Sequence, residues 1–204
     1  MISLTRRALM LALPVGLAAC DVLPKSQPPP KLYTLTPARD FPPSLPTVNK
    51  QLLIDVPVAA GATDTERIAL MKTAVTLDYF ADAAWTDRAP VLVQSLLVES
   101  FENSGKIGAI GRDTVALRAD YVLTSELRDF TAIYGAGGAP TVHVRLGVKL
   151  VRMDDRRIVG QRQFEAAEAA KQDAIIPVVD AFDAALRHVM TEIVTWTLPA
   201  IAHA

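Results

Sequence analysis

Residues 119–150 read ADYVLTSELRDFTAIYGAGGAPTVHVRLGVKL and contain the clearest hairpin pattern in the chain. Residues 119–134 are rich in β-branched and aromatic side chains, which is typical of a long strand, and the glycine-rich segment 135–140 predicts that the chain then reverses. Side chains on a strand point alternately to its two faces, so alternation on the return predicts an antiparallel hairpin with one buried face. The alternating apolar residues are Val142, Val144, Leu146, Val148 and Leu150.

A third strand is expected to extend this hairpin. Residues 154–156, Asp-Asp-Arg, predict a turn, and residues 158–164 continue as the next strand of the same meander. The face opposite the apolar one carries His143, Arg145 and Lys149. We expect that face to remain partly in contact with water unless a partner covers it.

Shorter strands are predicted before the hairpin. The β-branched and aromatic residues at 32–35 and the apolar run at 52–56 each suit a short strand. Residues 67–71 and 75–80 predict a second hairpin. The later strand of that hairpin places three apolar residues on one face: Val75, Leu77 and Tyr79.

Two segments have the periodicity of amphipathic helices. The first begins at Pro90, because proline favours the first turn of a helix, and ends at the stop signal Asn103-Ser104-Gly105. The second spans residues 175–198, with Pro177 in its first turn. Four side chains on the apolar faces of these helices are predicted to be buried: Leu97, Phe101, Phe182 and Leu186.

The order of strands, helix, strands and helix predicts an α+β fold. In this fold, a largely antiparallel sheet is covered on one face by two helices. The chain has 204 residues, of which 50% are hydrophobic and 21% charged, and this is enough for one sizeable core. We therefore expect a single domain over residues 32–204.

The N-terminal residues have the features of a bacterial lipoprotein signal. Two arginines are followed by the apolar segment 8–17, which has the length of a secretory signal and is too short to span a membrane. Residues 17–20, LAAC, match the lipobox, in which small residues precede a cysteine whose thiol receives diacylglycerol. Cys20 is the only cysteine, so it cannot form an internal disulfide. The sequence predicts a signal peptide over residues 1–19 and an acylated Cys20 that anchors the protein to a membrane.

The export route and the target membrane stay open at this stage. Residues 5–10, TRRALM, resemble a twin-arginine signal, but we favour general secretion, whose basic start also produces paired arginines. Asp21 resembles an inner-membrane retention signal and weakly favours the inner membrane over the outer. Residues 20–31 contain four prolines and predict a semi-rigid tether on the periplasmic side.

Charge and residue types exclude several classes of function. The net charge is -1, and removal of the two signal-peptide arginines makes it -1 - 2 = -3, so we expect no nucleic acid partner and no basic patch for anionic headgroups. The histidines His143, His188 and His203 lack the spacing of a metal site. The sequence contains no nucleophile-and-base motif and no phosphate-binding loop, so we expect neither catalytic residues nor a metal or cofactor.

Four residues near predicted element ends are candidates for binding a protein partner. Aromatic and arginine side chains commonly anchor interfaces, so each residue qualifies where its side chain is exposed. For the tryptophan we favour an alternative, in which the indole packs in the core at the entrance to the first helix. The four candidates are Trp85, Arg88, Arg112 and Tyr134.

Several short motifs occur in an order and spacing that resemble one family. After the lipobox come LYTL at 32–35, TERIA at 65–69, DYF at 78–80 leading to Trp85, LLVESF at 96–101 and ADYVL at 119–123. Together they resemble the ABC-type transport auxiliary lipoprotein family, which includes the paraquat-inducible, PqiC-type lipoproteins. The resemblance extends from Leu32 to Leu198.

This resemblance implies an accessory subunit of an MCE-type lipid transport system. In such a system an ABC ATPase and permease lie in the inner membrane and an MCE-domain protein extends into the periplasm. The resemblance implies a docking module without catalysis and transfers no site residue beyond Cys20. Two other readings stay open: an envelope-integrity or assembly lipoprotein unrelated to transport, and a lipid-modifying enzyme at the membrane surface. Formation of a homo-oligomer also stays open.

Overall fold

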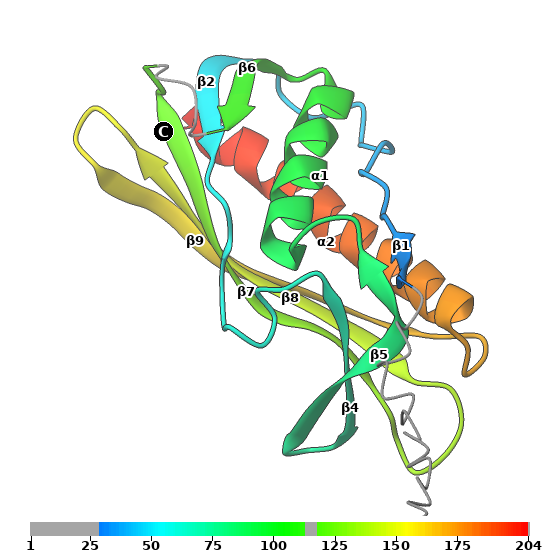
Figure 1. Ribbon diagram of the computed structural model, residues 1–204. Coiled ribbons are helices and arrows are strands. Elements are labelled where there is room, and N and C mark those ends of the chain that lie inside the picture. The colour runs from blue at the N-terminus through cyan, green and yellow to red at the C-terminus, as the bar shows by residue number, and fades with distance from the viewer. Residues whose placement is uncertain (1–28, 113–117, 204) are drawn as a thin grey trace, which may run out of the picture.

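The computed structural model describes residues 29–112 and 118–203. Within these residues, nine strands form one sheet and two helices lie together on one of its faces (Figure 1). The predicted signal peptide, Cys20 and Asp21 lie outside the described residues.

The predicted meander is confirmed and forms one half of the sheet. It consists of β7 (Tyr121–Ile133), β8 (Thr141–Arg152) and β9 (Arg157–Ala169), paired in antiparallel order. The alternate residues of β8 that the sequence marked as apolar are buried, at 0–2% exposure. One face of the meander therefore belongs to the core.

Six shorter strands complete the sheet on the other side of β7. Five of them follow the order β1-β5-β4-β7-β2-β6 together with β7, and the sixth, β3, also pairs with β7. The sequence predicted four of them and missed β3 and β6, because β3 has only two residues and β6, IGAIGR, contains two glycines. The strands are β1 (Lys31–Tyr33), β2 (Val48–Ile54), β3 (Val58–Ala59), β4 (Arg67–Thr73), β5 (Thr76–Trp85) and β6 (Ile107–Arg112).

The expectation of a largely antiparallel sheet is wrong, because the sheet is mixed. Among the described strands five pairings are parallel and three are antiparallel. The parallel pairs arise where the chain crosses over, as when α1 (Ala89–Ser104) carries it from β5 to β6, which lies parallel to β2. Alternating apolar residues reveal a strand but not the direction of its neighbour.

Both predicted helices are present. α1 ends at Ser104, and Gly105, with φ 62°, caps it in the left-handed conformation that glycine adopts without strain. α2 (Ile175–His203) extends past the predicted end and includes Pro199, because its apolar face continues through the buried Leu198 and Ile201. No helix in the described ranges has the length and apolar character to cross a membrane.

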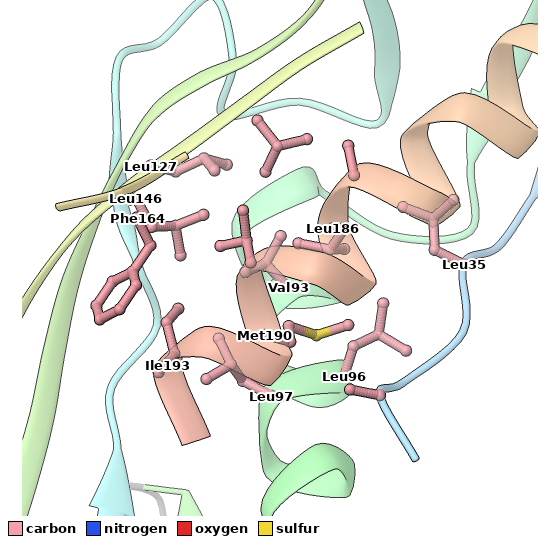
Figure 2. Packing of buried hydrophobic residues seen from close by; sticks show 14 of the residues in the cluster. Leu35, Val93, Leu96, Leu97, Leu127, Leu146, Phe164, Leu186, Met190 and Ile193 are labelled. Carbon is pink, nitrogen blue, oxygen red and sulfur yellow. The ribbon is translucent and has the colours of Figure 1, made fainter. Parts of the chain in front are cut away.

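The core lies between the two helices and the inner face of the sheet. Figure 2 shows Leu186, Met190 and Ile193 of α2 among side chains that come from α1 and from the sheet. The four helix residues predicted to be buried are confirmed, at 0–1% exposure: Leu97, Phe101, Phe182 and Leu186. An aromatic cluster joins the layers, since the Phe182 ring lies 5.1 Å from Trp85 and 4.9 Å from Phe130.

Phe182→Ala should lower the free energy of unfolding by about 3 to 5 kcal/mol, because it removes the ring that joins α2 to two other aromatic side chains. Ile176→Ala on the same helix is the matched control. Its side chain is 62% exposed, so the change should be within about 0.5 kcal/mol. Urea unfolding followed by circular dichroism measures both. Equal midpoints for Phe182→Ala and the wild type would contradict this packing.

Candidate functional site

A polar groove crosses the sheet face that lies opposite the helices. Its volume is about 590 Å³, and it is bordered by side chains of β7, β8 and β9 together with Val58 of β3. The polar groups on its walls are Thr124, Ser125, Glu126, Arg128, Lys149, Gln161, Arg162 and Gln163. None of the described residues that line it is a histidine or a cysteine.

The Arg128 guanidinium lies across the centre of this groove. It spans from β7 to β9, because its Nε donates to Glu126 at 2.9 Å and one terminal nitrogen donates to Gln163 at 2.9 Å. Gly147 makes this crossing possible: a Cβ there would lie 3.0 Å from the Arg128 Cζ atom. The glycine keeps the floor of the groove low enough for an arginine to lie flat on it.

Further polar contacts continue the network along the face. The Gln163 amide donates to Glu165 at 3.2 Å, and Arg145 pairs with Asp129 at 2.5 Å. Lys149 is exposed and forms no ion pair within the described part of the chain. The prediction that this face stays partly wet is therefore confirmed.

The alternating charges of this face suit recognition of another protein. Each exposed ion pair contributes little to stability, in the range of about 0–1 kcal/mol. Charges of both signs on a rigid sheet can instead specify a partner with the complementary pattern. The two hydrogen bonds of Arg128 hold its guanidinium in one position in the groove, which reduces the entropy that this side chain would lose on binding.

Trp85 is in the core, as the favoured reading predicted. It is the last residue of β5, is 1% exposed and packs against Phe130 at 5.5 Å. Its indole Nε1 is buried and has no hydrogen-bond partner among the described residues. Because the side chain is not exposed, Trp85 does not qualify as an interface anchor.

Arg88 and Arg112 are both exposed but lie in different surroundings. Arg88 precedes α1 and pairs with Asp64, and its Nε donates to that carboxylate at 2.9 Å. Hydrogen bonding to Asp64 raises the pKa of Arg88. Arg112 is the last residue of β6, in register with Ile54 of β2. Binding of a partner by either arginine stays a prediction.

The structure does not bring the four predicted residues together. Ile54 of β2 pairs with Arg112 on one side and with Leu123 on the other, so Arg112 and Leu123 are level in the sheet. Tyr134 lies eleven residues beyond Leu123 along β7, or roughly 36 Å at the rise of a strand. One small partner surface could not contact both Arg112 and Tyr134.

Tyr134 joins the end of β7 to the segment before α2. Its hydroxyl donates to the Asp173 carboxylate at 2.7 Å. Burial of the ring, followed by this hydrogen bond and the nearby negative charge, raises the pKa of Tyr134 to about 12. The side chain thus has a structural role within the chain, which competes with a role in binding a partner.

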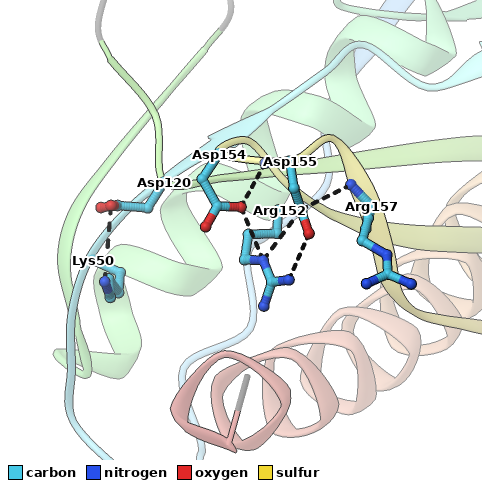
Figure 3. Close-up of polar contacts among 6 residues, drawn as sticks. All are labelled: Lys50, Asp120, Arg152, Asp154, Asp155 and Arg157. Atoms are coloured by element: carbon cyan, nitrogen blue, oxygen red, sulfur yellow. Dashed lines mark hydrogen bonds and ion pairs between the residues drawn. The ribbon is translucent and has the colours of Figure 1, made fainter.

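An ion-pair cluster stabilises the turn between β8 and β9 (Figure 3). The Arg152 guanidinium contacts the carboxylates of Asp154 at 2.9 Å and Asp155 at 2.8 Å. The hydrogen bond from Arg152 lowers the pKa of Asp155 to about 2. Close by, Lys50 lies 3.9 Å from Asp120. Each of these carboxylates is thus paired with a basic side chain. Among the described residues no group of three or more His, Cys, Asp or Glu side chains is arranged to hold a metal.

Through Arg145 and Lys149 the sequence indicated which sheet face meets solvent, but it did not indicate the groove on that face. Arg128, Glu126 and Gln163 lie on two strands that are not adjacent, and their contacts depend on the register of both. A usable signal was Gly147, because a glycine inside an alternating strand often marks a close approach of another group.

Comparison with known proteins gives consistent matches. The family model described as "ABC-type transport auxiliary lipoprotein component" matches residues 33–194. An uncharacterized protein, bll6063 of Bradyrhizobium diazoefficiens, is 32% identical over 171 residues, which are 83% of this chain and 45% of the relative. This chain therefore spans less than half the length of that relative.

Solved structures agree with the same fold. The crystal structure of protein XCC0632 from Xanthomonas campestris, described under the family DUF330, has a TM-score of 0.80 and 33% identity, and covers 85% of this chain and 97% of that one. The hypothetical protein CT253 from Chlamydia trachomatis has a TM-score of 0.52 at 9% identity, covering 77% of this chain and 100% of that one, and shows the fold alone.

Tyr134→Phe should make unfolding less sensitive to high pH. The folded state holds the Tyr134 pKa above its ordinary value, so the tyrosine's contribution to stability is complete below about pH 10 and declines as the pH rises toward about 12. The phenylalanine variant loses the hydrogen bond, which costs about 1 kcal/mol at pH 8, but it has no phenol to ionise. Urea unfolding of both proteins should show that the difference between their free energies of unfolding is smaller at pH 11 than at pH 8. A constant difference would contradict the raised pKa.

Proposed function

The chain belongs to the ABC-type transport auxiliary lipoprotein family, and on that basis we propose that it is a lipid-anchored accessory subunit of an MCE-type ABC lipid transport system. The mature domain acts in the periplasm as a docking module and has no turnover of its own. Its partners are the MCE-domain protein and, through it, the permease and ATPase of the same system.

The observation that supports docking is the groove across β7, β8 and β9. Arg128 lies over Gly147 in a position set by two hydrogen bonds, so a partner meets a preformed surface. The surface offers donors from Arg128 and Lys149 and acceptors from Glu126. Such a pattern fits a polar, partly hydrated protein interface, in which charges determine specificity more than affinity.

Two other functions receive less support. A lipid-modifying enzyme needs a nucleophile next to a base, and the hydroxyls of the groove, Thr124 and Ser125, have no histidine beside them among the lining residues. An envelope-assembly lipoprotein unrelated to transport would use the same fold and anchor. Family membership favours transport, and neighbouring genes for an ATPase, a permease and an MCE-domain protein would separate the two.

Cys20→Ser should release the protein from membranes, because the hydroxyl cannot accept the diacylglycerol that anchors the mature chain. Cell fractionation and mass spectrometry of the N-terminus measure this. We expect the wild type in the membrane fraction with a lipid on Cys20, and the variant either soluble in the periplasm or unprocessed. A native wild-type protein whose N-terminus lies upstream of Cys20 and carries no lipid would contradict the anchor.

Gly147→Ala should weaken docking without unfolding the domain. The new Cβ displaces the flexible end of Arg128 from the groove floor, and loss of one well-placed contact commonly costs about tenfold in affinity. Co-purification of the MCE-domain protein with the membrane-anchored variant measures the effect. Arg128→Ala should act in the same direction.

Gly61→Ala is the matched control for this experiment. A Cβ at Gly61 meets nothing within 4 Å, so this variant should retain the partner as the wild type does. Circular dichroism should show that both glycine variants are folded. Equal recovery of the partner with Gly147→Ala and with Gly61→Ala would place the docking surface elsewhere.

A further inference from the structure

Three connections lie together at one end of the sheet, here called the near end. They are the β4–β5 turn around Val75, the β7–β8 loop at 134–140 and the connection between β9 and α2 at 170–174 (Figure 1). The strand register confirms the grouping, because Ile133 pairs with Met71 on one side and with Thr141 on the other, and Thr141 pairs with Ala169.

The described chain also enters the domain from the direction of the near end. β1 runs parallel to β5, with Lys31 in register with Ala83. β5 starts at the near end, at Thr76, and runs away from it. Pro29 and Pro30, the described residues before Lys31, therefore lie on the same side as the β4–β5 turn.

The length of chain before Lys31 limits where the membrane anchor lies. Cys20 is 31 - 20 = 11 residues upstream, and eleven residues reach at most about 34 Å at the rise of a polyproline II helix. β1 and Arg67 of β4 both pair with Ala84 of β5, so they are level with each other. Arg67 lies four residues before Met71, which pairs with Ile133, so β1 is level with about residue 129 of β7. The opposite, far end begins at Tyr121, roughly 26 Å further from the anchor side. Placing the far end on the membrane would use roughly 26 Å of that reach, which contact through the near end does not require.

The two ends also differ in their surfaces. At the near end Val75 is 89% exposed, Ile176 is 62% exposed and Ile133 is 37% exposed. At the far end Ile158 is 54% exposed and Met153 is 37% exposed, but both flank the turn between β8 and β9, which carries the ion pairs of Arg152 with Asp154 and Asp155. Transfer of exposed apolar side chains into the interfacial region of a bilayer lowers the free energy, whereas transfer of a cluster of charges raises it because the charges lose hydration.

We infer that the near end contacts the bilayer that holds the lipid anchor, with Val75 and Ile176 entering the boundary between headgroups and acyl chains. The inference rests on the proposed acylation of Cys20. A few apolar side chains bind a membrane weakly by themselves, but a short tether holds them at an effective concentration on the order of millimolar. The exposed charges near this end, Lys72, Lys171 and Asp173, are of both signs, so the contact does not require anionic lipid.

This orientation also positions the groove. β7 to β9 run away from the membrane, and Glu126 in the groove lies seven residues from Ile133, or roughly 23 Å along the strand. The groove then opens sideways above the bilayer, where a periplasmic partner reaches it.

The test places a fluorescent label at each end of the anchored protein. Acylation consumes the thiol of Cys20, the only native cysteine, so Val75→Cys, Ile176→Cys and Met153→Cys each provide one reactive thiol. Met153 lies at the far-end turn and is 37% exposed, which makes it the control. The acylated variants are labelled with the environment-sensitive dye NBD and reconstituted into phosphatidylcholine vesicles, with and without nitroxide lipids that quench fluorescence at the bilayer surface.

We expect NBD emission to rise at least twofold and to be quenched by nitroxide lipid at position 75, at position 176 or at both, while position 153 behaves as in water. Emission at both near-end positions that is no higher than at position 153, or quenching that is strongest at 153, would overturn the inference. A wild-type protein without lipid on Cys20 that fails to associate with the vesicles would instead refute the proposed anchor, so the two failures are distinguishable.

Discussion

Burial of one face of β8 beneath α2 is the contact on which the rest of the structure depends. Val144 and Leu146 of β8 and Met190 and Ile193 of α2 are all fully buried. A slip of one residue in the register of β8 would move these strand side chains to solvent and bring Arg145 and Lys149 into the core. The cost of that exchange fixes the register of β7 and β9, which pair with β8 on either side.

A fixed register on the inner face also determines the outer face. Glu126, Gly147 and Gln163 lie opposite one another on three neighbouring strands, and only this alignment lets Arg128 reach across the glycine to the glutamine. The side chains of the groove contribute little to folding, since their ion pairs are exposed. The hydrophobic core thus fixes the strand register on which the polar face depends.

The parts of the fold predicted from the sequence were those with strong local signals. The alternation in β8 and the stop at Gly105 depend on residues close together in the chain, and both are confirmed. The mixed sheet was missed because parallel pairing of β2 with β6 depends on the path of α1 between them. The groove was missed for a similar reason: Arg128 and Gln163 are 35 residues apart, and no local pattern relates them. Trp85 was assigned correctly to the core because a large aromatic before a helix usually packs there.

An anchored domain does not need a strong interface to hold its partner. With the acylation of Cys20 that we propose, the tether would confine the groove to a thin layer above the membrane, and confinement raises the effective concentration of a partner fixed in or above the same bilayer. Exposed charges such as those of Arg128 and Glu126 then need to supply mainly specificity, and they remain sensitive to salt because water screens them. It follows that loss of the anchor should impair assembly more than loss of any one ion pair, although the anchor makes no contact with the partner. In this protein the lipid would supply most of the affinity, and the polar face of the sheet would select the partner.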